Sequence, residues 1–521
     1  MQRLIRGVDP LVFWGSTGVS TAFVLWGVFG TDSLASVMSS VLDWVIANFG
    51  WAFVLIATGA LVFVIVVAIS PWGRIRLGPD DSRPEFQTVS WVAMMFAAGL
   101  GLGLMFYGVA EPISHFAAPP HGLAEPRTPE AAQVALETTY FHWGFNGWAI
   151  YAIMGLALAY FTFRRGGKNL VSATFAPLLG EHVSERPVGR LIDGLAIFAT
   201  LFGTATSLGL GALQINSGMN FLWDVTISNT IGVLIIIVIT ALFVLSAVSG
   251  VERGIQFLSN LSGGATIGLM IFFLLAGPTV FIIGTSIETI GGYILNVFPM
   301  SLRMDTFTNS DWMAAWTIFY WAWWISWAPF VGTFVARISR GRTIREFIIG
   351  VVAMPTGMGF VWFAIIGSTA IDMQVSGQAD LIATTSTPEL SLFAALEELP
   401  FTTITSVLSM ILIAFFFISG ADAASIVMGM MASRGVLEPA KTVTAVMGCL
   451  MGAIASALLL VGGLSALQQG AVLASVPFTF VLVGLVWCLI KALREEDVPL
   501  PAPAVAAPVR TANPGTLRDE G

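Results

Sequence analysis

Tryptophan is the residue type that gathers most densely in this sequence. Six of the 17 tryptophans lie between Trp312 and Trp327. At 100° per residue of an α-helix, four aromatic side chains of this segment fall within about 60° of one another: Trp316, Tyr320, Trp323 and Trp327. Trp324 lies beside them. The segment therefore predicts a helix with one aromatic face, and such a face attracts a cation whose charge is spread over methyl groups.

A second aromatic group occurs in FHWGFNGWAIY at 141–151, where Trp143, Trp148 and Tyr151 occupy an arc of about 140°. Tryptophan is common at membrane interfaces, and this explanation suits Trp312 and Trp316. The other tryptophans lie a turn or more inside their segments, so the two groups could face each other as a cage. A quaternary ammonium ion cannot donate hydrogen bonds, and a cage of rings could bind it without a buried carboxylate. The alternative is that these rings only pack.

Glycine recurs at every second position in FAAGLGLGLMFYGVAEP, as Gly99, Gly101 and Gly103. Small residues permit close helix packing, but three such glycines also permit local unwinding, which exposes backbone groups to ions and substrates. Glu111 and Pro112 follow at the outer end of this segment. A second interruption is predicted at Pro329 in SWAPF.

Ionisable residues at membrane depth are scarce, with His142 and Asp422 as the main candidates. Without clustered His, Asp or Glu, an intramembrane metalloenzyme or a proton-relay pump lacks its parts. No nucleophile elbow is evident, so the protein is not expected to be an enzyme. Cys449 and Cys488 cannot form a disulfide framework. The net charge of −8 and the lack of a basic stripe disfavour nucleic-acid binding.

The composition requires a membrane to position these residues. Of the 521 residues, 56% are hydrophobic and only 10% are charged, against about 25% charged in a soluble domain. A span needs about 20 apolar residues, and twelve stretches qualify: 11–30, 44–70, 88–109, 133–163, 190–222, 229–250, 254–283, 311–337, 344–371, 402–431, 442–462 and 468–490. The predicted fold class is an all-α polytopic membrane protein with twelve transmembrane helices.

Basic residues set the expected orientation, because Lys and Arg accumulate on the cytoplasmic side. With the amino terminus inside, 21 of the 23 basic residues lie on inner segments, and only Arg127 and Arg303 lie outside. We therefore expect a multi-pass protein of the cell (inner) membrane with both termini in the cytoplasm.

The two interrupted spans, third and eighth, are five spans apart, as two inverted five-helix repeats would require. The predicted division is a short cytoplasmic amino terminus, two additional helices, a first repeat, an outer surface helix, a second repeat and a disordered cytoplasmic tail. These segments are 1–10, 11–87, 88–283, 284–310, 311–491 and 492–521. A second short surface piece is expected at 389–399.

Several segments are similar to one family. FYWAWWISWAPFVGTFVARISRGRTIREF at 319–347 closely resembles the signature helix and basic loop of the betaine/choline/carnitine transporters. GLGLGLMFYGVAEP at 99–112, FHWGFNGWAIY at 141–151 and FGTATSLGLGALQI at 202–215 match other marked segments of that family. The resemblance covers all but the two tails, and it implies a leucine-transporter-type inverted-repeat fold, alternating access and a homotrimer.

The resemblance also assigns site residues. The family's aromatic box falls on Trp143, Trp148, Tyr151 and Trp324, and the pathway around it falls on Trp323, Trp327 and Phe319. A sodium site falls on the backbone of Ala97 and Leu100 and on Phe416, Ser419 and Gly420. Gly420 stands where the sodium-coupled pattern has a second hydroxyl. A further sodium site falls on Thr200 and Thr204, although these threonines could instead bond to their own helix.

These assignments imply a transporter that imports a quaternary-ammonium or related osmolyte with sodium, glycine betaine before others. The alternative is a sodium-independent exchanger of carnitine-like compounds, but exchangers of the family carry an arginine in the seventh span, and 256–283 contains no Arg or Lys. Choline carriers tend to have an acid where this chain has Gly103, so choline is disfavoured. Ectoine, carnitine, proline betaine and sulfonium osmolytes remain open. No cofactor is implied beyond the coupling sodium ion.

Overall fold

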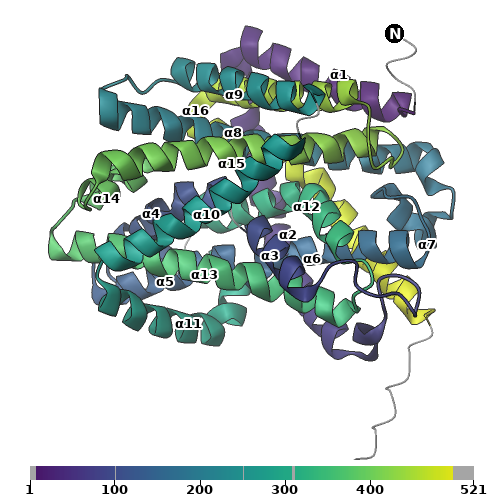
Figure 1. The fold of residues 1–521 in the computed structure, drawn as a ribbon, viewed down its shortest axis with the longest axis horizontal. Coiled ribbons are helices and arrows are strands. Elements are labelled where there is room, and N and C mark those ends of the chain that lie inside the picture. The colour runs from purple at the N-terminus through teal and green to yellow at the C-terminus, as the bar shows by residue number, and fades with distance from the viewer. Residues whose placement is uncertain (1–6, 100, 250–251, 308–310, 497–521) are drawn as a thin grey trace, which may run out of the picture.

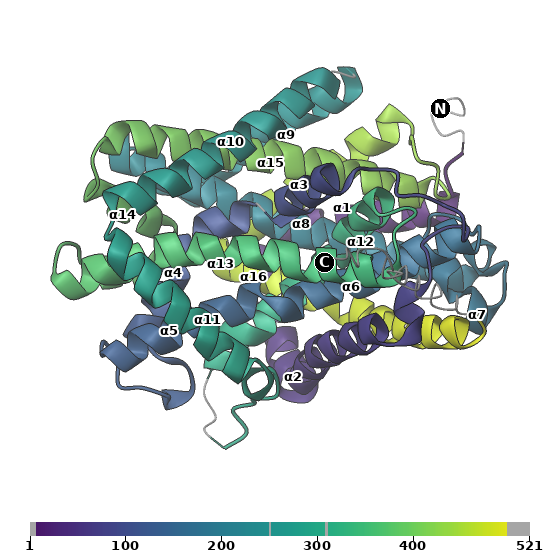
Figure 2. The same ribbon diagram turned by 60° about the horizontal axis from the view of Figure 1, so that its bottom comes forward.

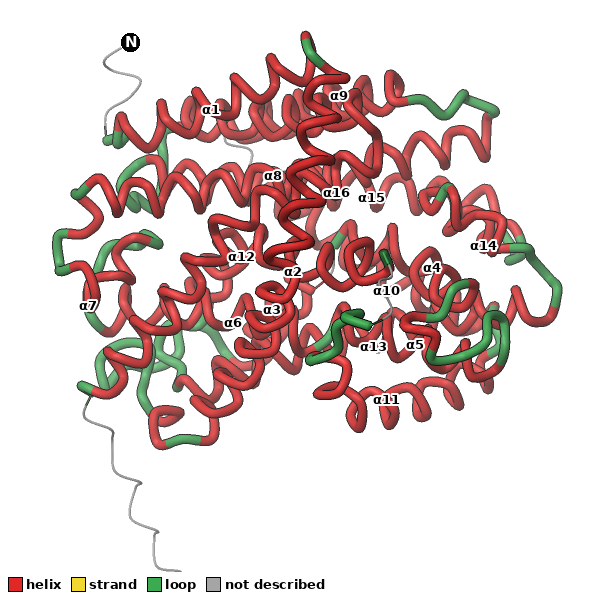
Figure 3. Tube along the Cα trace, turned by 180° about the vertical axis from the view of Figure 1, so that it is seen from behind, coloured by secondary structure: helices red, strands yellow, loops and turns green. Residues whose placement is uncertain are grey.

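The chain is helical throughout the part that the computed structural model describes, which is residues 7–99, 101–249, 252–307 and 311–496. Figure 3 shows these residues as helices joined by loops, and the one pairing of extended segments among them is an isolated bridge between Arg76 and Thr343. The helices are α1 Pro10–Phe29, α2 Thr31–Ile69, α3 Thr88–Gly99, α4 Leu102–Ala117, α5 Pro129–Trp143, α6 Phe145–Ala159, α7 Ala176–Leu179, α8 Pro187–Trp223, α9 Asn229–Ser249, α10 Glu252–Ala276, α11 Thr279–Ser301, α12 Phe319–Ile338, α13 Ile344–Ser376, α14 Ser391–Glu397, α15 Thr402–Ala432 and α16 Lys441–Arg494.

Several long helices, among them α8, α9, α13 and α15, run side by side along one direction (Figure 1). The start of α1, the short α7 and the end of α16 lie at the right-hand end of the bundle, whereas α5 and α14 lie at the other end (Figures 1 and 2). The first and last described helices therefore begin and end on the same side, as an even number of crossings requires. The predicted tail of 492–521 and the start of the predicted amino terminus fall largely outside the described residues.

Nine helices among the described residues are long and apolar enough to cross a membrane, by length and composition. Several of the twelve predicted spans are divided or joined in the structure, so a count of helices is not a count of crossings. The predicted third span is divided between α3 and α4, and the last two predicted spans are the arms of α16, which bends at Gly462 and Gly463. The exact number of twelve stays a prediction.

Two interruptions place the ends of short helices inside the bundle. One separates α3 from α4, where Gly101 has extended backbone with φ −164° and ψ 175°, at the glycine-rich stretch expected to unwind. The other was not expected: α5 ends at Trp143 and α6 begins at Phe145. A Cβ at Gly144 would lie 2.5 Å from the Tyr140 carbonyl oxygen and 2.6 Å from the Tyr293 hydroxyl, so only glycine fits this junction.

The predicted interruption at Pro329 is wrong, because Pro329 lies inside the continuous helix α12. A proline removes one N–H donor, and buried helices tolerate this loss where neighbouring groups satisfy the freed backbone. The inverted repeats were predicted from two interrupted helices, and only one of those two predicted interruptions, between α3 and α4, is present in the structure.

Other boundaries also differ from the sequence prediction. Helix α2 begins at Thr31 rather than near 44, because its first turns are too polar to register as a span. Helix α10 ends at Ala276, before Gly277 and Pro278, and α11 starts at Thr279 rather than 284. By length and composition α11 could itself span a membrane, so its predicted position along the outer surface stays a prediction.

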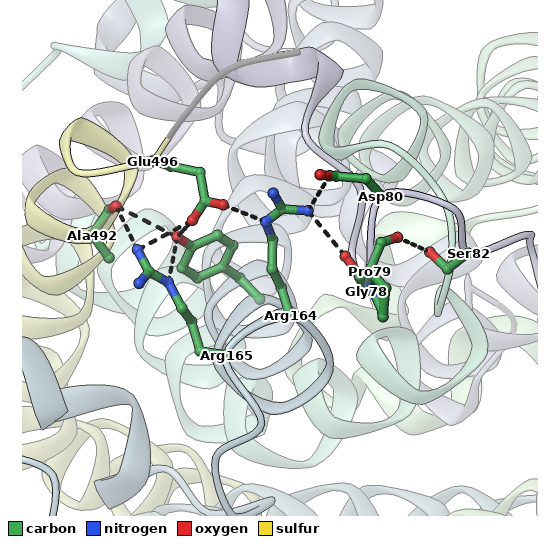
Figure 4. A network of polar contacts seen from close by, with 9 residues as sticks. Gly78, Pro79, Asp80, Ser82, Arg164, Arg165, Ala492 and Glu496 are labelled. Carbon is green, nitrogen blue, oxygen red and sulfur yellow. Dashed lines mark hydrogen bonds and ion pairs between the residues drawn. The ribbon is translucent and has the colours of Figure 1, made fainter.

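A charged network closes the end of the bundle at which α16 ends (Figure 4). Glu496 accepts a hydrogen bond from Arg164 Nε at 2.6 Å and from the Tyr160 hydroxyl at 2.5 Å, and Arg165 Nη2 lies 3.1 Å from its carboxylate. Arg164 also donates to Asp80 Oδ1 at 2.7 Å. The carboxyl end of α16 is thus tied to the end of the α5–α6 arm and to the loop that follows α2.

We expect the Glu496 network to stabilise the protein in a pH-dependent way. Burial disfavours the charged form of Glu496, but hydrogen bonds from Tyr160 and Arg164 and the two nearby arginine charges outweigh it and lower the pKa of the carboxyl. A lowered folded-state pKa stabilises the fold above the ordinary glutamate pKa of about 4.3, and the effect is lost as the pH falls through the folded value. Glu496→Gln should therefore cost about 1 kcal/mol at neutral pH and progressively less in acid.

Thermal unfolding of the purified protein between pH 7 and pH 3 measures this difference. Glu495→Gln is the matched control, because it removes the same charge from the exposed neighbouring residue. A Glu496→Gln variant as stable as wild type at pH 7 would show that the network contributes nothing to stability.

Candidate functional site

An aromatic cavity lies where α5, α6 and α12 meet the break between α3 and α4. Its volume is about 100 Å³. Six of the seven aromatic residues predicted for the substrate site line it: Trp143, Trp148, Tyr151, Trp323, Trp324 and Trp327. Gly101, Leu102 and Gly103 at the start of α4 complete one wall. The structure thus brings together the two aromatic segments that the sequence paired.

Trp324 is the centre of the cage. Its ring centroid lies 4.8 Å from that of Tyr151, 5.4 Å from that of Trp148 and 6.2 Å from that of Trp143. The Trp324 Nε1–H donates to the His142 carbonyl at 3.0 Å, which fixes the indole across the α5–α6 junction. These rings meet at steep angles of 51° to 71°, so several π faces and edges surround one volume.

Two glycines make room for the rings. A Cβ at Gly147 would lie 2.5 Å from Trp324 Cδ2, and a Cβ at Gly103 would lie 2.6 Å from Trp143 Cη2. Real Cβ atoms essentially never approach other heavy atoms so closely. Gly147 could not be identified as a site residue from the sequence. The ring that it accommodates, Trp324, comes from another helix, so the local sequence around Gly147 does not indicate the contact.

Phe319 does not line the cavity. Its ring stacks on Trp323 with centroids 5.6 Å apart and an interplanar angle of 18°, and it is buried. Phe319 therefore supports a wall residue from behind. Trp312 and Trp316, expected at the membrane interface, are half-buried and pack against His115 with centroids 5.4 and 4.5 Å apart.

A second cavity of about 320 Å³ adjoins the first. The residues that line both are Gly101, Leu102, Ser207, Trp327 and Val331. Most of the residues predicted to hold sodium are found on its wall: Thr204, Phe416, Ser419 and Gly420. Ser207, which the sequence analysis missed, lies one turn after Thr204 on the same face of α8. Ala97 lies in α3, whereas Leu100 falls outside the described residues.

The hydroxyls of this region bond to their own helices. Thr200 Oγ1 donates to the Ala196 carbonyl at 2.8 Å, and Thr204 Oγ1 donates to the Thr200 carbonyl at 2.6 Å. Ser419 Oγ donates to the Phe415 carbonyl at 2.9 Å. Such bonds use the proton and leave oxygen lone pairs, so they do not prevent cation binding. Thr200 does not line either cavity.

A buried polar cluster lies directly beside the cage, and here the expectation of scattered ionisable residues is wrong. Glu111, His115 and His142 are fully buried and bring their ligand atoms within 4.8 Å of one another. Glu111 accepts a hydrogen bond from the indole N–H of Trp143 at 2.8 Å and one from the Tyr320 hydroxyl. The sequence placed Glu111 at the outer end of a span, but α4 continues to Ala117 and carries it into the protein.

A helical membrane bundle with an aromatic cage between broken helices defines a carrier of small solutes rather than a soluble enzyme. The sequence profile of the BCCT family, betaine/carnitine/choline family transporters, matches residues 11–498. The chain belongs to this family of membrane transporters, and it is an all-α, multi-pass membrane protein.

Individual relatives agree with the family profile. The chain is 47% identical to the glycine betaine transporter OpuD of Bacillus subtilis (strain 168), over 93% of this chain and 94% of that protein. It is 41% identical to the betaine/ectoine transporter LcoP of Corynebacterium glutamicum, over 95% and 79%. It is 39% identical to an ectoine/hydroxyectoine transporter of Virgibacillus pantothenticus, over 93% and 97%.

Proposed function

We propose that this protein imports a betaine-type osmolyte, glycine betaine before others, together with sodium by alternating access. The observation that carries the proposal is the cage of Trp143, Trp148, Tyr151 and Trp324, which lines a cavity of about 100 Å³ without a carboxylate in its lining. A trimethylammonium group keeps little hydration to lose, so ring faces can hold it. The relatives named for betaine and ectoine transport support the same substrate class.

The other end of the cavity suits a carboxylate. Helix α4 begins at Leu102 with Gly101 as its N-cap residue and without a side-chain cap. The first N–H groups of a helix lack partners within it and favour anions. Trp327 Nε1 is buried without a hydrogen-bond partner among the described residues and lines the same cavity. A zwitterion can therefore place its cation in the cage and its carboxylate against α4 and Trp327.

Gly103 argues against choline as the preferred substrate. Choline lacks a carboxylate of its own, and an acidic side chain at position 103 could supply the missing charge. Here a Cβ alone would lie 2.6 Å from Trp143 and 3.0 Å from Trp323, so the rings occupy the space that an acid would need.

Uptake into proteoliposomes tests the proposal. Radiolabelled glycine betaine should accumulate when a sodium gradient is imposed and should not accumulate with a potassium gradient of the same size. Exchange of carnitine-like compounds without sodium would establish the alternative, a sodium-independent exchanger. Absence of transport for every betaine and ectoine tested would refute the proposed function.

Gly420 is expected to weaken sodium binding. It stands where a second hydroxyl would lie beside Ser419, on the wall of the second cavity. Nothing lies within 4 Å of a Cβ built at Gly420, so a serine fits there, and packing alone does not explain the glycine. We expect Gly420→Ser to lower the sodium concentration at half-maximal uptake several-fold, because it adds one oxygen ligand.

Sodium titration of uptake measures this effect. Gly420→Ala is the matched control, since it fills the same space without a hydroxyl and should behave as wild type. Equal half-saturation in the serine and alanine variants would remove Gly420 from the sodium site.

The proposal includes the remaining properties implied by the family. The protein is expected to act as a homotrimer in the cell (inner) membrane with both termini in the cytoplasm. Gly99, Gly101 and Gly103 are proposed as the hinge, because the break between α3 and α4 touches both cavities. Thr200 and Thr204 stay candidates for a further sodium site.

A further inference from the structure

The cluster beside the cage has the composition of a metal site. Glu111 Oε1 lies 2.6 Å from His142 Nδ1 and 3.4 Å from His115 Nε2. Two imidazoles and one carboxylate are a ligand set that zinc sites use, with bonds of about 2.0–2.2 Å. Ligand atoms around such an ion are separated by roughly 3.4 Å, so the His142 contact must open by less than about 1 Å.

The outer partners of these residues are arranged to orient ligands. Glu111 directs Oε1 to the two histidines, whereas Oε2 accepts from Trp143 Nε1 at 2.8 Å and from the Tyr320 hydroxyl. The other ring nitrogen of His142, Nε2, lies 3.0 Å from Thr317 Oγ1. Metal-binding histidines and carboxylates are held by second partners of this kind, which fix the ring orientation and raise ligand basicity.

His115 is the second indication of a ligand. It is fully buried; its Nε2 has only the long 3.4 Å contact with Glu111 Oε1, and its Nδ1 has no hydrogen-bond partner among the described residues. A buried polar group without a partner is costly. Coordination through Nε2 would satisfy the imidazole lone pair, and a dication would balance the charge of the buried carboxylate.

We propose that Glu111, His115 and His142 bind a divalent transition-metal ion such as Zn²⁺. Imidazole nitrogen combined with carboxylate oxygen favours zinc, nickel or copper over magnesium. The ion would join α4, which carries Glu111 and His115, to α5, which carries His142. Tyr320 of α12 is held by the same carboxylate, so bound metal would fix three helices together at one end of the cage.

Metal binding at this position should inhibit transport. The three ligands are fully buried beside the cage, on α4 and α5, and α5 lies at the end of the bundle that is predicted to face outward (Figure 1). An ion that fixes these helices would oppose opening of the cage toward that side. This second consequence rests on the proposed transport function, whereas the binding itself does not.

Isothermal titration of the purified protein with zinc chloride tests the binding without any transport assay. We expect one zinc ion per chain in wild type and no comparable binding of magnesium. His115→Gln removes a residue that binds the metal directly. Loss of a residue that only supports a ligand weakens metal binding roughly 10- to 100-fold, so His115→Gln should weaken zinc binding by more than this. This variant keeps every hydrogen bond to Glu111 from Trp143, Tyr320 and His142, so it should remain folded. Thr317→Val should weaken binding by roughly 10- to 100-fold through His142.

His182→Gln is the matched control, because His182 is exposed and distant in sequence from the cluster; it should bind zinc as wild type does. Equal zinc affinity in wild type and His115→Gln would overturn the site. Uptake in proteoliposomes preincubated with zinc then tests whether bound metal inhibits transport. Inhibition of wild type together with its absence in His115→Gln supports this consequence, and uninhibited wild-type uptake refutes it. A protein that binds zinc at this site but transports nothing would leave the metal site standing and the proposed function refuted.

Discussion

Trp324→Ala is expected to abolish or greatly weaken uptake of the substrate. Trp324 contacts all three other rings of the cage, at centroid distances of 4.8 to 6.2 Å. A cation–π contact in a desolvated site contributes about 2 kcal/mol or more, so its loss alone should reduce affinity roughly thirty-fold. Substrate titration of uptake, together with binding to the purified protein, measures the change.

Two control variants separate loss of the cage from general damage. Trp324→Phe keeps a ring face but loses the bond to the His142 carbonyl, and it should be milder than alanine. Trp487→Ala makes the same truncation at a side chain that is 65% exposed, and it should leave uptake unchanged. Wild-type affinity and rate in Trp324→Ala would show that the cage is not the substrate site.

The cage could be predicted because its evidence is local. Trp323, Trp324 and Trp327 share one short segment, and Trp148 and Tyr151 share another, so helical periodicity groups each set before any contact is known. Apolar runs are also read from short segments of the sequence, and they predicted nearly every long helix. What periodicity could not supply was the angle and distance at which the two segments meet.

The Glu111 cluster could not be predicted for the opposite reason. Its three members come from two helices, α4 and α5, and each looks ordinary in its own segment: a glutamate beside a proline, a histidine beside a tryptophan. Depth was judged from the apolar run that ends near 109, whereas α4 continues to Ala117 because Pro112 is tolerated within it. Only the packing of α4 against α5 and α12 brings Glu111, His142 and Tyr320 together.

Of the two backbone breaks beside the cage, one could be predicted from the sequence and the other could not, for the same reason. The break after Gly99 has a local cause, three closely spaced glycines. The break at Gly144 depends on Tyr293 of α11, whose hydroxyl accepts a hydrogen bond from the Phe145 N–H at 3.0 Å. A partner 148 residues away in the sequence leaves no trace in a local pattern, and a proline such as Pro329 predicts a break that is absent when the helix continues through it.

Gly147→Ala should impair transport as strongly as truncating the cage. A methyl group at position 147 would lie 2.5 Å from Trp324 Cδ2. The indole can withdraw only by losing its packing on Trp148 and Tyr151 and its bond to the His142 carbonyl. Overpacking of this kind costs about 1–3 kcal/mol. We expect the ring to move into the cavity and the substrate affinity to fall at least tenfold.

Gly357→Ala is the matched glycine control for Gly147→Ala, since a Cβ there meets nothing within 4 Å, and it should transport as wild type does. The double variant Gly147→Ala with Trp324→Ala is the decisive measurement. Alanine at position 324 has no ring to collide with the added methyl group, so the double variant should bind substrate no more weakly than Trp324→Ala alone. Adjacent residues that share one constraint show such non-additivity, whereas independent sites add. If the two changes simply add, Gly147 does not act through Trp324, and the close approach of α6 to α12 is not what shapes the cage.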